Sequence, residues 1–256
     1  MKQIFSAVFE SVWKRKETKL FLAFSLYPLI YLVTSFFGQS NFMQIANADG
    51  IKVGYLDFAD MMLNSMDMLI LPTLALYFLT ISVFRRETDD HTMFLYKDLN
   101  RKMIYMAKYF SLIIILILYF ALFFLTSLFV HYTRVAHLDF GTARFTSDTL
   151  YYTLFALLSM FTIFLKGIVS ISIASLVSLR FGTGATMTTA IVFTLIMMIM
   201  PMVGGPMATL FPSGYKQFIE TVPDMWIGVV GPIVITLIYA ALCNSLSLKK
   251  FKQLEF

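Results

Sequence analysis

Two charged residues, Lys166 and Asp67, lie well inside long apolar stretches of the sequence. The next charge after Lys166 is Arg180, about 21 Å further along a helix axis at 1.5 Å per residue. A charge in the middle of a bilayer costs at least about 2.5–3.5 kcal/mol, so it needs a partner, water or a route to the interface. We hypothesise that Lys166 either pairs with Asp67 or lines a polar path. The alternative is that Lys166 extends to the outer membrane surface.

Motifs for catalysis or nucleotide binding are absent from the sequence. The chain has no Gly-x-x-x-x-Gly-Lys-Ser/Thr loop to cradle phosphates, no His-Glu-x-x-His zinc motif and no Gly-x-Ser-x-Gly motif. The single cysteine, Cys243, excludes a disulfide within the chain. His131, His137 and Asp139 lie near one another, but such groups in a loop are mostly solvated, so we expect no metal site. The sequence predicts that the chain is not an enzyme and binds no cofactor itself.

A densely charged segment between Arg85 and Lys108 also carries an apolar patch. A purely solvated loop needs no such patch, whereas a short amphipathic helix that docks into the groove of a partner does. The alternative is a helix that lies among lipid headgroups. The residues that we expect to contact a partner are Glu87, Met93, Phe94, Leu95, Tyr96, Leu99 and Arg101.

Methionine is abundant, with 17 residues. Its thioether side chain repacks around varied apolar shapes. Met62 and Met66 lie near one end of an apolar stretch, and Met198 and Met202 lie near one end of another. These four residues could form an adaptable surface for an apolar or amphipathic cargo. The alternative is that they face lipid or fill the interior.

The elements that must position these residues are membrane helices. The chain of 256 residues is 59% hydrophobic and only 14% charged, whereas soluble domains are about 45–50% apolar and about 25% charged. A bilayer core of about 30 Å takes roughly 20 helical residues. We therefore predict an all-α integral membrane protein with six transmembrane helices, in which residues 1–256 form a single transmembrane domain. The predicted spans are Leu20–Phe37, Met61–Phe84, Tyr109–Val130, Thr149–Leu179, Ala185–Val203 and Met225–Leu246.

The distribution of lysine and arginine predicts the orientation of these spans. Fifteen of these residues fall in the N-terminal segment, the second and fourth connections and the C-terminal tail, whereas four fall on the other side. Because basic connections stay in the cytoplasm, we predict that both chain ends are cytoplasmic. The same bias accounts for an isoelectric point near 9.2, with basic residues facing anionic headgroups rather than nucleic acid.

Residues 1–18 are too short and too charged to form a span. Apolar side chains recur there at helical spacing on one stripe, which indicates a helix that lies in the membrane interface. The alternative is a helix that packs on a soluble partner. The stripe consists of Ile4, Phe5, Val8, Phe9, Val12 and Trp13.

The connection 204–223 before the last span is rich in proline and glycine yet still apolar. Continuous helix is disfavoured by this composition. We predict two short helices, Pro206–Phe211 and Ser213–Val222, that re-enter the outer leaflet, where protein or water must cover irregular backbone. The alternative is a surface loop.

Over the whole chain, these features resemble the membrane subunit of a bacterial ABC-2 type transporter. That family has an interfacial N-terminal helix, six spans, a cytoplasmic coupling helix between spans two and three, and a re-entrant helical pair before span six. Glu87, followed by Arg101 and Lys108, is similar to the Glu…Arg…Lys pattern of the family. The compact size and short outer loops look most like exporters of small peptides, such as the permeases of lantibiotic immunity.

The resemblance implies an ATP-driven exporter subunit in the bacterial plasma membrane. A second identical or similar membrane subunit and two separate ATPase subunits, which bind ATP and Mg²⁺, would complete the transporter. The segment around Glu87–Arg101 would receive the force, and Lys166 and Asp67 would lie on the translocation path. Two other functions stay open: a secondary transporter or channel, which would show intramembrane ion-coupling acids, and a membrane-embedded lipid-modifying enzyme.

Overall fold

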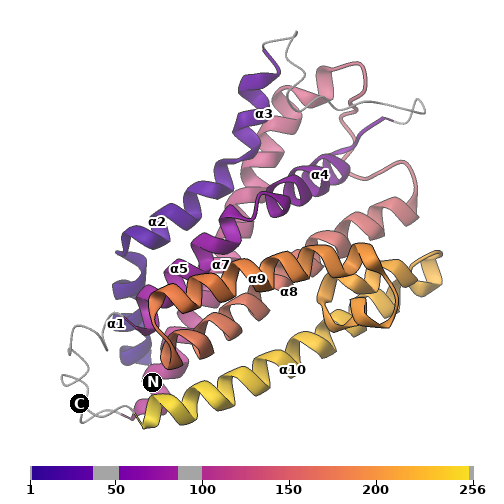
Figure 1. Cartoon of the computed structure of the whole chain (residues 1–256). Helices are drawn as coiled ribbons and strands as arrows, with labels where there is room; N and C mark the ends of the chain where they lie inside the picture. The colour runs from indigo at the N-terminus through magenta and orange to yellow at the C-terminus, as the bar shows by residue number, and fades with distance from the viewer. Residues whose placement is uncertain (1, 37–51, 86–99, 254–256) are drawn as a thin grey trace.

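The computed structural model describes residues 2–36, 52–85 and 100–253, and these fold almost entirely into helices (Figure 1). In these three ranges the only β-type pairing is an isolated bridge between Val53 and Gly141. Four helices are long and apolar enough to cross a membrane, or five if one bent pair counts as a single span. The chain therefore has the helices of a multi-pass transmembrane protein. The four long helices are α7 (Arg101–Thr133), α8 (Leu150–Arg180), α9 (Thr183–Val203) and α10 (Met225–Lys252).

These four helices correspond to the last four predicted spans, and the largest differences are the earlier start of α7 and the later end of α10. Helix α7 begins where the Asn100 side chain accepts a hydrogen bond from the Lys102 amide at 3.0 Å, which is an N-cap. Residues 101–108 of the predicted connection 85–108 are therefore helical. Helix α8 begins in the same way, because the Thr149 hydroxyl accepts from the Tyr152 amide at 3.3 Å.

The first predicted span, Leu20–Phe37, is wrong as a single helix. The chain forms α2 (Lys16–Ala23), the 3-10 turn η1 (Phe24–Leu26) and α3 (Pro28–Thr34). Proline at position 28 has no backbone N–H to continue a helix through this point. The broken segment still runs along the bundle, since Arg15 donates to the Ser82 carbonyl near one end and Ser35 accepts from Arg134 at 3.0 Å near the other.

The second predicted span, Met61–Phe84, is also wrong as a single helix. It is divided into α4 (Tyr55–Met68) and α5 (Leu71–Phe84), which are bent by 64°. Pro72 in the first turn of α5 cannot donate to the carbonyl four residues earlier, and its ring disfavours helix before it. Ile70 turns the chain in the left-handed region, with φ 62°.

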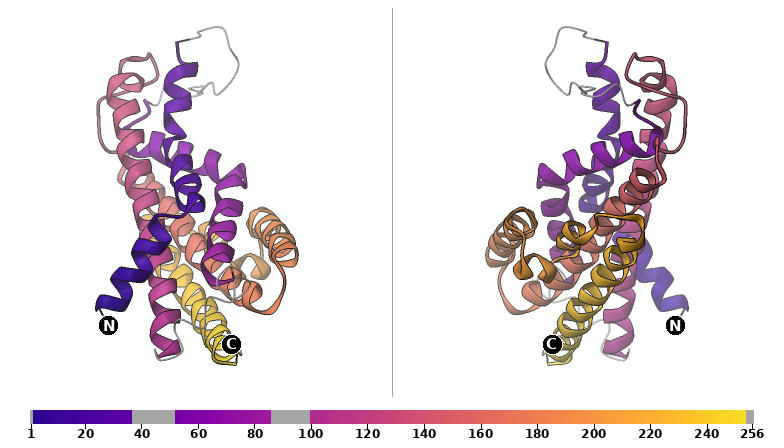
Figure 2. Two further views of the ribbon diagram at one scale, coloured as in Figure 1. Left: turned by 90° about the vertical axis from the view of Figure 1, so that its left-hand side faces the viewer. Right: turned by 90° about the vertical axis from the view of Figure 1, so that its right-hand side faces the viewer.

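Helix α8 lies at the centre of the bundle. It packs along α10 and also contacts α4, α5, α7 and α9 (Figures 1 and 2). The start of α1 (Lys2–Trp13) and the end of α10 lie at the same end of the bundle, which we call the terminal end (Figure 1). Helix α7 begins there, because Arg101 donates to the Lys252 carbonyl. The opposite end, which holds the connection 134–149, is called the loop end.

Helix α1 packs against α7 of its own chain. Val12 is buried, and Val8 and Phe9 pack on the same core, while Trp13 stays exposed. The predicted apolar stripe therefore faces the bundle in part, and α1 ends at Trp13 rather than at residue 18. Its place in a membrane interface stays a prediction.

The segment between α9 and α10 contains three 3-10 helices instead of the two predicted short helices. Gly204 and Gly205 start it with φ values of 73° and 71°, which side chains other than glycine rarely adopt. The segment then packs against α8, α9 and α10. Its re-entry into a membrane stays a prediction. Its elements are η4 (Pro206–Leu210), η5 (Pro212–Phe218) and η6 (Val222–Asp224).

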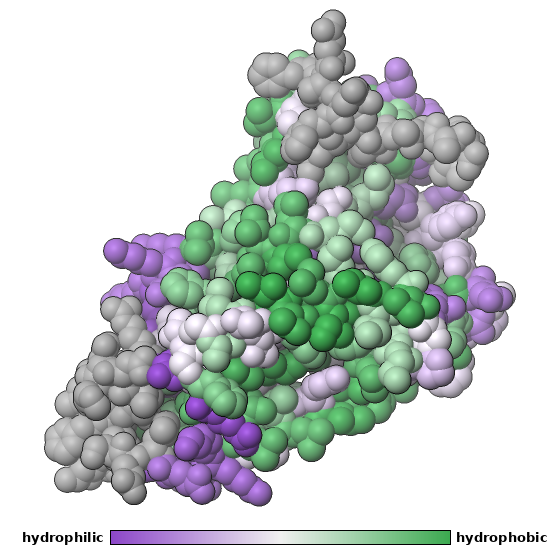
Figure 3. Space-filling model, in the orientation of Figure 1, coloured by the Kyte–Doolittle hydropathy of each residue, from purple (hydrophilic) through white to green (hydrophobic). Residues whose placement is uncertain are grey.

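The visible surface is divided by polarity. Hydrophobic residues cover the middle of the molecule, and hydrophilic residues gather towards its two ends (Figure 3). Apolar side chains on α9 and α10, such as Ile199, Leu237 and Leu242, are at least half exposed. This pattern fits a bundle surrounded by lipid.

Candidate functional site

The central feature of the candidate site is an ion pair between α8 and the break in the second span. The Lys166 ammonium lies 2.9 Å from each carboxylate oxygen of Asp67. The Lys166 side chain is 6% exposed and that of Asp67 is 26% exposed, so water screens the pair poorly. Of the three possibilities for Lys166, the structure contains the ion pair with Asp67 rather than an extension to the outer surface, whereas a role on a translocation path stays a prediction.

The break between α4 and α5 places Asp67 at the end of a helix. Asp67 lies in the last turn of α4, where the carbonyls of the helix end favour a cation over an anion. The Lys166 ammonium therefore neutralises both the carboxylate and the negative end of α4. A continuous helix would have presented no such end inside the bundle.

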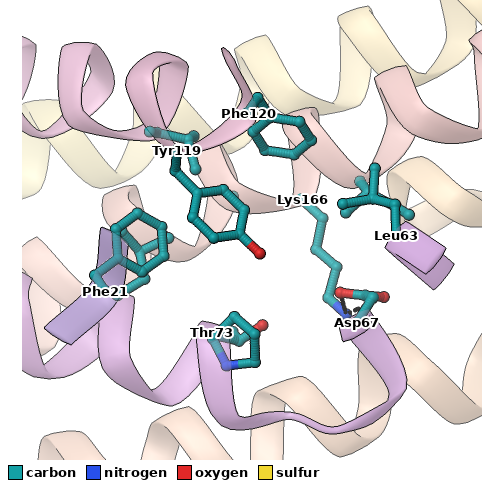
Figure 4. A pocket seen from close by; sticks show the side chains of 12 residues that line it. Phe21, Leu63, Asp67, Thr73, Tyr119, Phe120 and Lys166 are labelled. Carbon is teal, nitrogen blue, oxygen red and sulfur yellow. Dashed lines mark hydrogen bonds and ion pairs between the residues drawn. The ribbon is translucent and has the colours of Figure 1, made fainter. Parts of the chain in front are cut away.

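A small cavity of about 40 Å³ adjoins the ion pair. A water molecule needs about 10–15 Å³ of such space, so two or three would fit. The Tyr119 hydroxyl points into the space between Thr73 and Lys166, and rings of Phe21 and Phe120 close the other sides (Figure 4). The cavity thus places two hydroxyl groups and an ion pair behind aromatic walls.

A second polar cluster extends from this cavity towards the loop end. Lys216 of η5 donates to the Ser159 hydroxyl at 2.7 Å, and Asn64 donates to the same hydroxyl at 3.1 Å. Asn64 also donates to the carboxylate of Asp60 at 2.7 Å. Burial lowers the pKa of the Lys216 ammonium, and the nearby carboxylates of Asp60 and Asp67 oppose that shift. The two carboxylates of Asp60 and Asp67 therefore balance the charges of the two ammonium groups of Lys166 and Lys216.

Sequence reasoning missed Asp60, Asn64, Ser159 and Lys216. A signal for three of them was available, because Asp60, Asn64 and Asp67 recur at spacings of four and three on one face of a helix. Ser159 and Lys166, seven residues apart, likewise share one face of α8. Lys216 carried no such signal, since only the folding of η5 against α8 brings it to the cluster.

The structure describes only the two ends of the predicted coupling segment. Glu87, Met93, Phe94, Leu95, Tyr96 and Leu99 lie outside the described residues. Arg85, before this segment, donates to the carbonyls of Ser178, at 3.3 Å, and Phe181 at the end of α8. Arg101, after it, donates to the Lys252 carbonyl at the end of α10. Both borders are thereby attached to other helices.

The four methionines of the predicted cargo surface lie in different environments. Met62 and Met66 are 3% and 2% exposed and belong to the main core. Met198 on α9 is half-buried, and Met202 is exposed. In this structure Met62 and Met66 fill the interior, so the four do not form one accessible surface.

The histidines and acids that the structure describes do not gather into a metal site. Within the ranges that the structure covers, no group of three or more His, Cys, Asp or Glu side chains could hold a metal ion. His131 instead uses Nε2 in a 3.0 Å contact with the Thr142 carbonyl.

No protein-family model, curated protein or solved structure matches the chain.

Proposed function

We propose that this chain is the transmembrane subunit of an ATP-driven exporter of the ABC-2 type, which moves a hydrophobic or amphipathic cargo such as small peptides. A separate ATPase would dock on the connection between α5 and α7, and a second identical or similar membrane subunit would complete the path. The broken segment α2–α3 and the bent pair α4–α5 would each form one of six crossings. Both chain ends would then be cytoplasmic.

The attachment of Arg85 and Arg101 is the observation that carries this proposal. Each arginine borders the connection 86–99 and binds carbonyl groups at the C-terminal end of another helix, Arg85 on α8 and Arg101 on α10. A cation at that end of a helix is favoured by the helix dipole. A force on the connection would therefore reach the two helices that pack together most extensively.

Lys108 reinforces this attachment from inside the bundle. Its ammonium is buried, 5.9 Å from the ring centre of Phe84 at the end of α5 and 5.7 Å from that of Phe251 near the end of α10. Cation–π contacts of this kind are stronger when they are shielded from water. The ends of α5, α7 and α10 would therefore move together when a partner displaces the connection.

Copurification tests the proposal. The tagged chain, isolated from its native membrane, is expected to retain a nucleotide-binding ATPase, and alanine at Phe94, Leu95 and Tyr96 is expected to release it, because the apolar patch would fill the groove of that partner. Phe145→Ala is the matched control, since this exposed aromatic residue lies at the loop end. Absence of any ATPase from the wild-type preparation contradicts the proposed function. Unchanged retention by the triple variant contradicts only the docking segment.

An ion-coupled secondary transporter is the second candidate function. Discontinuous helices with charged residues at the break are typical binding sites in that class. The break between α4 and α5, with Asp67 paired to Lys166, has this form. The two functions differ in the energy source, so transport that persists in reconstituted vesicles without ATP and without an ATPase would favour the second.

A further inference from the structure

A groove of about 370 Å³ opens at the terminal end of the bundle, beside the last turns of α8 and α10. Three of the residues that line it are basic: Arg180 of α8, and Lys249 and Lys250 of α10. Leu246 and Gln253 also line this space, which we call the basic groove. The end of the molecule where α10 finishes is hydrophilic on the visible face (Figure 3). The basic groove thus places three cations around a space that a small anionic group can enter.

The cations of the basic groove are not neutralised by the helices around it. Helices α8, α9 and α10 contain no aspartate or glutamate along their whole lengths. Within the described part of the chain, no ion pair involves Arg180, Lys249 or Lys250. Three like charges around one space repel one another, and an anion between them removes that repulsion.

Other arginines occupy the carbonyl groups at these two helix ends. Lysine and arginine are favoured near helix C-termini, where the helix dipole attracts a positive charge. In this bundle, Arg85 donates to the Ser178 carbonyl at 3.3 Å near the end of α8, and Arg101 donates to the Lys252 carbonyl at the end of α10. The cations of the basic groove are therefore available for a ligand.

A buried tyrosine holds the two walls of the basic groove together. The Tyr105 hydroxyl of α7 donates to Asn244 of α10 at 2.6 Å and lies 3.5 Å from the Ser175 hydroxyl of α8. Asn244 comes five residues before Lys249, and Ser175 comes five residues before Arg180. Because α8 and α10 both end at the terminal end, the basic residues of the two helices lie at a similar level along the bundle.

An exposed apolar ridge on α10 leads away from the basic groove along the side of the bundle. Leu246 lines the groove, and Leu242, Ile238 and Val234 precede it at intervals of four residues. Each of these four side chains is between 39% and 58% exposed. At 1.5 Å per residue the ridge is about 18 Å long, slightly more than half of a bilayer core of about 30 Å. A ligand that fits both features has an anionic head and an apolar tail as long as one leaflet is deep.

We propose that the basic groove binds the phosphate group of an anionic phospholipid such as phosphatidylglycerol, whose acyl chains lie along the α10 ridge. The planar guanidinium of Arg180 would donate two hydrogen bonds to the phosphate, and Lys249 and Lys250 would add their charges. A free phosphate would meet the cations but leave the apolar ridge without a role. Basic pockets between membrane helices are suited to anionic headgroups in the cytoplasmic leaflet, the side on which the predicted orientation puts this end. The site depends only on the membrane bundle, so it is independent of the transport function proposed above.

Lipid binding to the purified full chain tests this site. The chain in detergent is titrated with phosphatidylglycerol or phosphatidylcholine, and native mass spectrometry counts the lipids that stay bound. We expect one tightly bound phosphatidylglycerol per chain, weaker binding of phosphatidylcholine, and no displacement by an equal concentration of inorganic phosphate. The triple variant Arg180→Gln, Lys249→Gln, Lys250→Gln should bind phosphatidylglycerol about 10–100-fold more weakly, because each basic residue near an anionic headgroup contributes about fivefold in affinity.

A matched variant separates this site from the general attraction of a basic protein to anionic lipid. Lys16→Gln, Lys19→Gln and Lys102→Gln together remove the same charge from exposed positions outside the basic groove, on the same predicted membrane face. This variant should bind phosphatidylglycerol as the wild type does, and thermal unfolding should show both triple variants folded.

Four results overturn the proposal. They are unchanged binding in the groove variant, equal losses in the two triple variants, equal binding of phosphatidylcholine and phosphatidylglycerol by the wild type, and displacement of the lipid by inorganic phosphate. The last of these would make the basic groove a site for the free anion. The last two results concern the wild type alone, so they decide the point even if the groove variant does not fold.

Discussion

The two broken segments of the bundle have similar causes and different consequences. Each contains a proline that removes a backbone donor, Pro28 in the first and Pro72 in the second. In the first, neutral hydroxyl groups repair the break: Ser25 donates to the Leu22 carbonyl at 2.6 Å, and Thr126 of α7 donates to the Ser25 carbonyl at 2.7 Å. The second break lies beside a charged pair and a cavity.

This difference shows what turns a helix break into a candidate site. Away from water, every backbone group freed by a break must be satisfied by the protein or by enclosed water. Neutral hydroxyl groups meet that need and leave nothing reactive behind. A carboxylate at the break instead requires a cation from a neighbouring helix, and Lys166 of α8 supplies it.

The largest expected effect comes from breaking the ion pair at the second break. Lys166→Met leaves the partly buried Asp67 carboxylate without its cation and should lower the free energy of unfolding by about 3 kcal/mol. Chemical unfolding in detergent measures this change. The double variant Lys166→Met with Asp67→Leu should recover most of the loss, since an apolar pair of similar size needs no compensation. A single-variant loss below about 1 kcal/mol would contradict a strong pair.

A charge swap tests whether the two residues act on each other. Asp67→Lys with Lys166→Asp should be more stable than either single change by about 1–3 kcal/mol, because groups in direct contact show coupling of that size. The same unfolding assay on the wild type, both single variants and the double variant gives the coupling. If the double variant is no better than either single one, the pairing has no energetic role.

Packing beside the second break should be less tolerant than packing at an open position. A Cβ on Gly167 would lie 2.9 Å from the Leu116 side chain, which also lines the cavity. Gly167→Ala should therefore cost about 1–3 kcal/mol through overpacking. Gly184→Ala on α9 meets nothing within 4 Å and should be neutral or stabilising by up to about 1 kcal/mol. Equal thermal stabilities for the two variants would show that Leu116 moves freely aside.

The smallest expected effect comes from removing a neutral hydroxyl group that bonds to the backbone at the first break. Thr126→Val removes the hydroxyl that donates to the Ser25 carbonyl and should cost about 0.5–1.5 kcal/mol. Thr188→Val is the control, because its exposed hydroxyl donates only within its own helix. Thermal unfolding of both variants decides the point. A loss for Thr126→Val as large as that for Lys166→Met would mean that the two breaks do not differ as described.

Much of the fold was predictable because it follows from local composition. The four long helices have the apolar length that a bilayer requires, and two of them, α7 and α8, start at side-chain caps, Asn100 and Thr149. The charged pair was predictable as one of three possibilities for Lys166, since Asp67 was the only acid well inside a predicted span. The two breaks were missed although Pro28 and Pro72 marked them, because hydropathy averages over single residues.

By itself, the sequence determined the class of this protein: apolar runs of bilayer length, two intramembrane charges and basic residues grouped at one predicted face. Tertiary structure alone decided which charge meets which, because the 64° bend between α4 and α5 turns the carboxylate of Asp67 towards α8. It also brought Lys216 of η5 to Ser159 of α8. These contacts join residues far apart in sequence, and no local pattern encodes the distances between packed helices.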